Sequence, residues 1–192
     1  MIDFENNVRN DNFMVYVMLA DGFEEVEALA PVDMLRRAGV NVMTVGVTGE
    51  AVRGSHGIVV AADITAQEMN MAGAEMIVLP GGMPGTLNLE KSEYVQAALE
   101  YCWENGIHIA AICAAPSILG HKGYLRGRYA VCFPGYEGEL NCRKVSDKPV
   151  ITDDGITTAK SAGYAVNFGC ELVNVLLGPE KATAVSDAVY QP

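Results

Sequence analysis

The chain has 192 residues, of which 50% are hydrophobic and 19% are charged, and this composition is typical of a globular protein with a sizeable core. Its formal net charge is −11. An acidic chain of this kind repels phosphate backbones, so the charge argues against nucleic-acid binding as a main role. No apolar stretch is long enough to span a bilayer, and we therefore expect no membrane partner.

The first 12 residues are polar and acidic, and they lack the charged-then-apolar layout of a secretory signal peptide. We interpret residues 1–12 as a disordered extension and residues 13–192 as a single domain. The five cysteines form an odd set without a CxxC pair, which argues against a disulfide framework and against a zinc site. Without a secretory signal, the pattern favours a cytoplasmic protein with reduced thiols.

Short apolar runs alternate with helical patterns along the chain. Strands are predicted at residues 13–20, 40–47, 75–79, 108–112 and 156–159, with shorter ones at 129–133 and 149–152 and a hairpin at 50–61. Helices are predicted at residues 21–39, 63–68, 94–105, 164–177 and 179–189, and directly after residue 115. The alternation predicts a doubly wound α/β sandwich with a mostly parallel sheet and helices on both faces.

The first helix has two features of its own. Asp21 is placed to cap it, and Glu24 and Glu25 are expected to be solvated acids in its first turn. Pro31 lies inside the pattern and predicts a kink or a late start of the regular helix.

Cys113 follows the apolar run at residues 108–112 and precedes a helical pattern that opens with Pro116, a residue suited to a first helical turn. Ala111 and Ala115 flank the cysteine, as small residues flank the nucleophile in a G-x-S-x-G elbow. Such a turn would aim the sulfur at the positive end of a helix, where a thiolate is favoured. The alternative is that Cys113 is a small buried hydrophobe, as free cysteines often are.

Two further strand ends carry candidate residues, and the site of an open α/β sheet lies beyond such ends. Glu27, near apolar neighbours, could be a neutral carboxyl that donates to a Cys113 thiolate, a general base, or simply an exposed helix acid. In the PGGMPG loop, the N–H of Gly82 is a candidate oxyanion donor together with the N–H of Ala114. The alternative for this loop is a plain turn.

None of the three histidines is placed at the elbow turn. His56 lies in the predicted hairpin, His108 opens the strand before Cys113, and His121 ends the helix after it. No Cys–His dyad is therefore visible locally. We expect His121 to act as a favourable cation near a helix C-terminus.

Three segments together, DGFEEVEALAPVDMLRRAG, VLPGGMPG and AAICAAPSIL, resemble the DJ-one/ThiJ/PfpI superfamily, above all the branch of the Parkinsonism-associated protein and its bacterial ThiJ-like relatives. The similarity runs in order from about residue 15 to residue 189. The resemblance implies a flavodoxin-like α/β sandwich, usually a homodimer, with no metal or organic cofactor. It also implies that Cys113 is a reactive elbow cysteine, that a protonated Glu27 hydrogen-bonds it, and that Gly82 and Ala114 supply backbone donors.

The sequence departs from the pattern of this superfamily at three places. Members of the intracellular protease type carry histidine directly after the elbow cysteine, where this chain has Ala114. Some members carry histidine before a proline where this chain has Phe133. A usual Gly-Pro-Gly near the last helices is replaced by residues 161–163, Ser-Ala-Gly, which could alter the pocket rim or a dimer contact.

These features lead to a hypothesis of a cysteine-dependent enzyme that acts on reactive carbonyls, of the glyoxalase or deglycase type. Its substrate would be a small aldehyde such as methylglyoxal, or the adduct of one on an amine or thiol, and Cys113 would form a hemithioacetal with it. The alternative is a redox sensor or chaperone-like protein of oxidative stress that uses oxidation of Cys113. An amidase or peptidase is a third possibility, and it needs a histidine from elsewhere in the fold or from a dimer partner.

Overall fold

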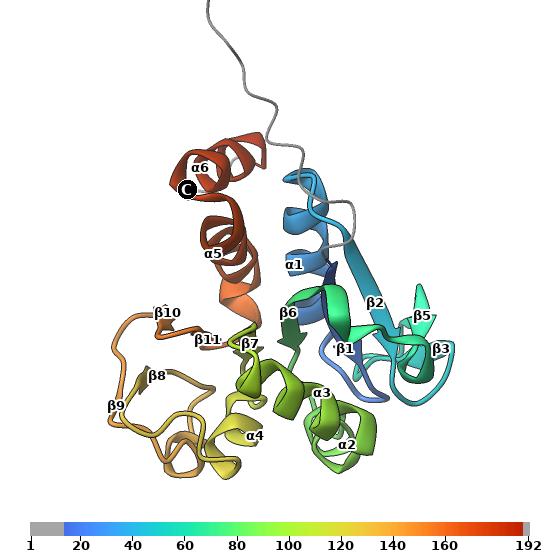
Figure 1. The fold of residues 1–192 in the computed structure, drawn as a ribbon, viewed down its shortest axis with the longest axis horizontal. Coiled ribbons are helices and arrows are strands. Elements are labelled where there is room, and N and C mark those ends of the chain that lie inside the picture. The colour runs from blue at the N-terminus through green and yellow to red at the C-terminus, as the bar shows by residue number, and fades with distance from the viewer. Residues whose placement is uncertain (1–13, 190–192) are drawn as a thin grey trace, which may run out of the picture.

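Seven strands form one central sheet in the structure, a computed structural model that describes residues 14–189 (Figure 1). The predicted extension at residues 1–12 lies outside the described residues. The strand order is β10-β11-β7-β6-β1-β2-β5. Strand β10 is antiparallel to β11, and the other neighbours in the sheet are parallel, so the prediction of a mostly parallel sheet is confirmed.

The elements follow the predicted alternation closely. The strands of the large sheet are β1 (Met14–Leu19), β2 (Val42–Gly46), β5 (Ile64–Thr65), β6 (Ala74–Leu79), β7 (His108–Ile112), β10 (Val150–Asp153) and β11 (Ile156–Ala159). Two small sheets pair β3 (Ala51–Arg53) with β4 (Val59–Ala61), and β8 (Tyr129–Ala130) with β9 (Lys144–Val145). The α-helices are α1 (Glu25–Arg37), α2 (Gly85–Lys91), α3 (Glu93–Glu104), α4 (Pro116–His121), α5 (Ala165–Leu177) and α6 (Pro179–Ala188). Short 3₁₀ helices occur at η1 (Ala66–Glu68), η2 (Met71–Gly73), η3 (Glu137–Glu139) and η4 (Ala162–Tyr164).

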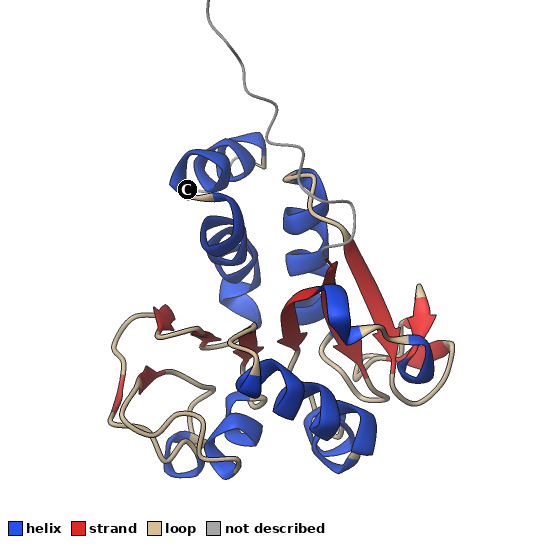
Figure 2. Ribbon diagram, viewed as in Figure 1, coloured by secondary structure: helices blue, strands red, loops and turns tan. Residues whose placement is uncertain are grey.

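Each face of the sheet is covered by its own group of helices (Figure 2). Side chains alternate across a strand, and on β1 Val15 and Val17 pack with apolar residues of α1 and α5, whereas Tyr16 and Met18 pack with those of α3 and α4. The two hydrophobic clusters thus lie on opposite sides of the sheet. This is the three-layer, flavodoxin-like α/β fold that the sequence and its resemblance predicted.

Three elements differ from the prediction or decide between its alternatives. Helix α2 was not predicted, because the turn signals of the PGGMPG loop run directly into it. Residues 63–68 form β5 and then the 3₁₀ helix η1, so only the second half of that segment is helical. Helix α1 begins at Glu25 and continues through Pro31, so a late start after the proline is wrong.

Asp21 does not cap α1, contrary to the prediction. The N-cap residue is Glu24, which makes no capping hydrogen bond through its side chain. The Asp21 carboxylate instead accepts a 2.8 Å hydrogen bond from the N–H of Arg53 on β3. Within residues 14–189, no helix has both the length and the apolar character needed to cross a membrane.

Candidate active site

Cys113 occupies the turn between β7 and α4, and its backbone has the strained conformation expected of a nucleophile elbow. Its φ angle is 66°, in the left-handed region that residues other than glycine rarely adopt. The turn is held by a 2.9 Å hydrogen bond from the Cys113 N–H to the Ala159 carbonyl and a 2.8 Å bond from the Phe133 N–H to the Cys113 carbonyl. Cys113 is partly exposed, so it is not a fully buried core residue.

Glu27 lies in the first turn of α1 with only 1% of its surface exposed, so the interpretation as an exposed helix acid is wrong. Its Oε2 accepts a 3.0 Å hydrogen bond from the N–H of Gly81 in the loop after β6. The carboxyl also forms a side-chain hydrogen bond with Cys113 and interacts with the backbone of Ala162. The structure therefore brings Glu27 and Cys113 together from distant parts of the chain.

Burial raises the pKa of Glu27 to about 7, although hydrogen bonds from Cys113, Gly81 and Ala162 oppose this effect. Burial also raises the pKa of the Cys113 thiol, and the negative charge of Glu27, when that carboxyl is ionised, raises it further, to about 12. The two acids therefore do not ionise together, and when the pair is ionised it holds one proton and one negative charge.

The N–H groups of Ala114 and Gly82 both hydrogen-bond the Cys113 sulfur and lower its pKa. This lowering is smaller than the effect of burial, and α4 has only six residues. The N–H groups at the elbow therefore favour a thiolate, as expected, but burial and an ionised Glu27 oppose it. A Cys113 thiolate forms readily only when the shared proton is on Glu27, because the carboxyl is then neutral.

Gly82 is held firmly in its position beside the sulfur. Its φ angle of 92° favours glycine, and a Cβ atom there would collide with the backbone of Glu24 and Gly22. Ala114 is almost fully buried next to Cys113. Both predicted donor groups thus lie at the sulfur.

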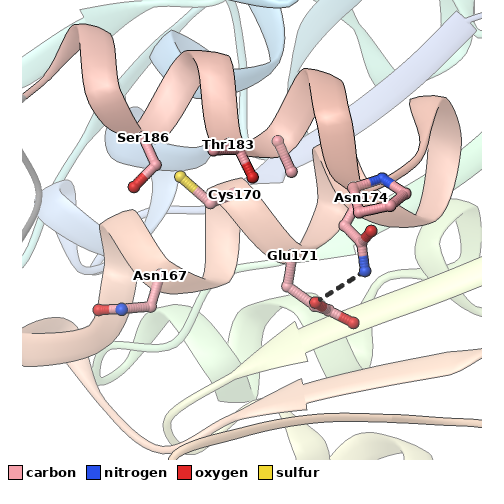
Figure 3. Close-up of a pocket in the computed structure, with 8 residues that line it drawn as sticks. Asn167, Cys170, Glu171, Asn174, Thr183 and Ser186 are labelled. Carbon is pink, nitrogen blue, oxygen red and sulfur yellow. Dashed lines mark hydrogen bonds between the residues drawn. The ribbon is translucent and has the colours of Figure 1, made fainter.

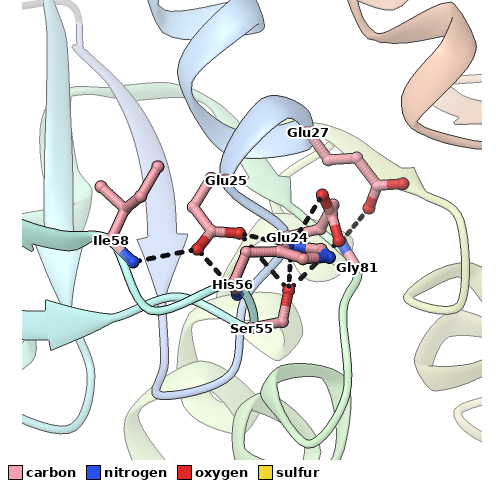
Figure 4. Close-up of polar contacts among 7 residues, drawn as sticks. All are labelled: Glu24, Glu25, Glu27, Ser55, His56, Ile58 and Gly81. Carbon is pink, nitrogen blue, oxygen red and sulfur yellow. Dashed lines mark hydrogen bonds and ion pairs between the residues drawn. The ribbon is translucent and has the colours of Figure 1, made fainter.

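Glu25 differs from its prediction as a solvated acid. Only 4% of it is exposed, and its carboxylate lies against the β3–β4 turn (Figure 4). Its Oε1 accepts hydrogen bonds from the N–H groups of His56, at 2.9 Å, and Ile58, at 3.3 Å. Its Oε2 lies 3.0 Å from Nδ1 of His56. Burial favours a raised pKa for Glu25, but these hydrogen bonds outweigh burial and leave its pKa below the ordinary value.

Glu24, Glu25 and His56 are also the residues most suited to hold a cation among those that the structure describes. One ligand atom from each lies within 4.8 Å of the others. The same atoms are already engaged with one another and with Ser55, so the geometry by itself does not indicate a metal. The absence of a metal cofactor stays a prediction.

The other two histidines lie away from the Cys113 turn. His108 begins β7, and its ring nitrogen lies 2.8 Å from the Thr157 hydroxyl. Burial lowers the pKa of His108 to about 4, so the ring is neutral. His121 is in the last turn of α4, as predicted, and its ring lies between Glu90 and Glu139. Neither histidine contacts Cys113 in the hydrogen bonds of the described residues.

The backbone donors to Glu27, Gly81 and Ala162, were not identified from the sequence. Gly81 lies in the same loop as Gly82, and no sequence feature pointed to its N–H as a donor to Glu27. Ala162 was noted only as a departure from Gly-Pro-Gly. A groove of about 370 Å³ lies between α5 and α6 (Figure 3). Cys170 and Glu171 line this groove, which is separate from the elbow.

The fold and the cysteine elbow define a class of flavodoxin-like α/β proteins, and comparison with known proteins gives the family. Residues 14–175 match the model of the DJ-1/PfpI family, and the chain belongs to this family. It is 34% identical over 173 residues to Protein dj-1beta of Drosophila melanogaster, a match that covers 88% of this chain and 92% of the relative.

Two further similarities bear on function. The chain is 30% identical over 166 residues to the Glutathione-independent glyoxalase DJR-1.2 of Caenorhabditis elegans, and the match covers 84% of this chain and 87% of the relative. Among solved structures, oxidized DJ-1 of Toxoplasma gondii has a TM-score of 0.86 and 32% sequence identity, covering 93% of this chain and 98% of that chain.

Proposed function

We propose that the protein is a cysteine-dependent enzyme that acts on small reactive carbonyls, of the glyoxalase or deglycase type. The observation that carries this proposal is the Cys113–Glu27 pair, in which the partly exposed Cys113 forms a hydrogen bond with a buried carboxyl beside two backbone N–H donors. The glyoxalase name of a relative that is 30% identical over most of its length supports the same class of reaction.

In the proposed first step, the proton is on Glu27 and the Cys113 sulfur is a thiolate. The sulfur attacks the aldehyde carbon of a compound such as methylglyoxal, a C–S bond forms, and the C=O π electrons move to the oxygen. The N–H groups of Gly82 and Ala114 are suited to stabilise this developing oxyanion. Transfer of the proton from Glu27 to the oxygen then gives a neutral hemithioacetal and leaves Glu27 as a carboxylate that can act as a base.

The experiment that tests this proposal is turnover of methylglyoxal in the absence of glutathione. We expect Cys113→Ala to abolish turnover, because no other group at the elbow can form the covalent adduct. Cys142→Ala is a matched control, because Cys142 is also a partly exposed free cysteine, and it should retain wild-type turnover. Equal turnover by wild type and Cys113→Ala would show that the proposal is wrong.

A second candidate function is redox sensing, and the partial exposure of Cys113 beside a carboxyl that can hold a proton favours it. Oxidation of the sulfur to a sulfinate would place two oxygens where Glu27 and the two N–H groups can hydrogen-bond them. The relative from Toxoplasma gondii has a solved structure titled as oxidized. Mass spectrometry after mild peroxide treatment should find oxidation first at Cys113, and equal oxidation of all five cysteines would contradict this function.

A homodimer, a cytoplasmic location and the absence of an organic cofactor complete the proposal and rest on the family resemblance. Sedimentation at several protein concentrations would test the dimer. Peptidase and amidase activity are less well supported, because the hydrogen bonds of the described residues include none between a histidine and Cys113.

A further inference from the structure

Glu24 lies directly beside the Cys113–Glu27 pair, although it takes no part in the proposed chemistry. Its N–H donates a 2.9 Å hydrogen bond to the carbonyl of Gly81, and the N–H of the same Gly81 donates to the Glu27 carboxyl. The peptide groups around one glycine thus connect Glu24 and Glu27. Glu24 also packs against Gly82, where its backbone leaves no room for a Cβ atom.

The side chain of Glu24 is held by the turn between β3 and β4 (Figure 4). The Ser55 hydroxyl donates to its Oε2 at 3.2 Å, and Nδ1 of His56 lies 3.5 Å from its Oε1. The N–H of Ser55 donates a 2.8 Å hydrogen bond to the carbonyl of Phe23, which fixes the turn against the start of α1. These contacts leave only 19% of the Glu24 side chain exposed.

From this geometry we propose that Glu24 is a positioning residue that keeps the shared proton on Glu27, so that Cys113 is the ionised partner. The inference rests on the Cys113–Glu27 pair of the proposed function. A negative charge held near Glu27 disfavours a second negative charge on its carboxyl, and the proton therefore stays there. The charge of the pair is then carried by the sulfur, where the N–H groups of Gly82 and Ala114 stabilise it.

The charges that face these carboxyls support this assignment. The charge of Glu24 raises the pKa of Glu27, which lies one turn further along the start of α1. From the β3–β4 turn, His56 faces both Glu24 and Glu25, and its hydrogen bond with Glu25 and the charges of both acids raise its pKa. A protonated His56 would therefore partly offset the charge of Glu24.

The test is the rate of Cys113 alkylation by iodoacetamide at pH 7, quantified by peptide mass spectrometry. This assay does not depend on turnover, so its outcome is separate from a failure of the proposed function. Glu24→Gln removes the charge and keeps the shape, and we expect alkylation about threefold slower, as for a change of about half a unit in the pKa of Glu27. Glu24→Asp, which keeps the charge, should restore most of the rate.

Two controls separate an electrostatic role from a structural one. Glu180→Gln removes the same charge from an exposed position on α6 and should leave the rate unchanged. His56→Gln removes a cation beside Glu24, so an electrostatic role predicts that it does not slow the alkylation of Cys113. If Glu24 acted only by holding the β3–β4 turn in place, alkylation would be slower in both His56→Gln and Glu24→Gln.

Slower alkylation in Glu24→Gln, without slowing in His56→Gln or Glu180→Gln, supports the proposal. Any other result for these three variants overturns it. Thermal unfolding followed by circular dichroism shows whether each variant is folded at the assay temperature. If Glu24→Gln is not folded, the comparison passes to Glu24→Asp and His56→Gln, and slowing of both of these variants also overturns the proposal.

Discussion

The Glu27 carboxyl and the N–H of Gly81 form a 3.0 Å hydrogen bond between residues that are 54 positions apart in the sequence. This contact connects the first turn of α1 to the loop after β6, on neighbouring strands β1 and β6 of the sheet. Because Cys113 follows β7, the next strand, three adjacent strand ends supply the carboxyl, the N–H donors and the sulfur. The site is therefore a product of the strand order.

A methyl group at Gly81 should disrupt this arrangement. A Cβ atom there would lie 2.6 Å from Oε2 of Glu27 and 2.7 Å from Cβ of Cys113, so Gly81→Ala must push the pair apart. We expect a loss of about 1–3 kcal/mol in the free energy of unfolding, as for other overpacked sites, together with slower alkylation of Cys113. Gly138→Ala is the control, because nothing lies within 4 Å of its Cβ position. Equal free energies of unfolding in urea for Gly81→Ala and Gly138→Ala would contradict the predicted crowding at Gly81.

Ala162 supplies a backbone interaction with Glu27 that lowers the pKa of this carboxyl. Ala162→Pro removes the N–H group at the start of η4, a position where proline is tolerated. The pKa of Glu27 should then rise by up to about one unit, because the charged carboxylate loses a donor. Isotope-edited infrared spectroscopy should show the protonated carboxyl persisting to higher pH. Ala162→Ser keeps the N–H, so the pKa of Glu27 in this variant should match that of wild type. If Ala162→Pro leaves the pKa of Glu27 unchanged, Ala162 is not a donor to this carboxyl.

Glu25 is expected to contribute to stability, because its carboxylate accepts the N–H groups of His56 and Ile58. Glu25→Ala leaves these donors without their acceptor, and we expect a loss of about 1–3 kcal/mol in the free energy of unfolding at pH 7. Glu25→Gln keeps an acceptor oxygen, so its loss in the free energy of unfolding should be smaller than that of Glu25→Ala.

The pH dependence has a definite sign. The pKa of Glu25 is lowered in the folded protein, so its contribution is present above the ordinary value of 4.5 and is lost as the pH falls through the folded value. The free energies of unfolding of wild type and Glu25→Ala, measured with urea, should therefore become more similar as the pH falls into the acid range. A difference that stays constant from pH 7 into acid would contradict this linkage.

His121 should show the opposite dependence on pH. Its ring nitrogens lie 2.5 Å from a Glu90 oxygen and 2.8 Å from a Glu139 oxygen, and these hydrogen bonds raise its pKa. Its stabilising contribution is present below the ordinary value of 6.5 and is lost as the pH rises through the raised value. The side chain is 41% exposed, so we expect a contribution below about 1 kcal/mol. The stability difference between wild type and His121→Gln should shrink from pH 6 to pH 9, and growth of this difference would contradict the assignment.

The fold could be predicted from the sequence because the buried strands are short apolar runs separated by helical patterns. Such a pattern fixes the type of each element and the class of the sheet. Helix α2 escaped prediction because Pro84 and Gly85 mark a turn, and here that turn begins a helix. The start of α1 was misplaced because Asp21 binds Arg53, a partner that only the folded chain brings near.

The site could be predicted only in part. Cys113 was visible from its small neighbours, because a tight turn needs them. The local pattern predicted Glu25 as a solvated acid and left the role of Glu27 open, since the burial of both depends on the PGG loop and on the β3–β4 turn. The family resemblance identified Glu27, whereas the raised pKa of the Cys113 thiol follows from burial beside a carboxyl and is not a property of the elbow sequence.

The most direct test of the shared proton is the pH profile of Cys113 alkylation in wild type and Glu27→Gln. If Glu27 holds the proton, its negative charge no longer raises the pKa of Cys113, and we expect the wild-type thiolate to form with a midpoint below about 8.5, the ordinary value for cysteine. In Glu27→Gln the midpoint should be higher, because an amide is a weaker donor to the thiolate than a carboxylic acid. A wild-type midpoint at or above about 8.5 would place the proton on the sulfur and contradict a nucleophilic Cys113 at neutral pH.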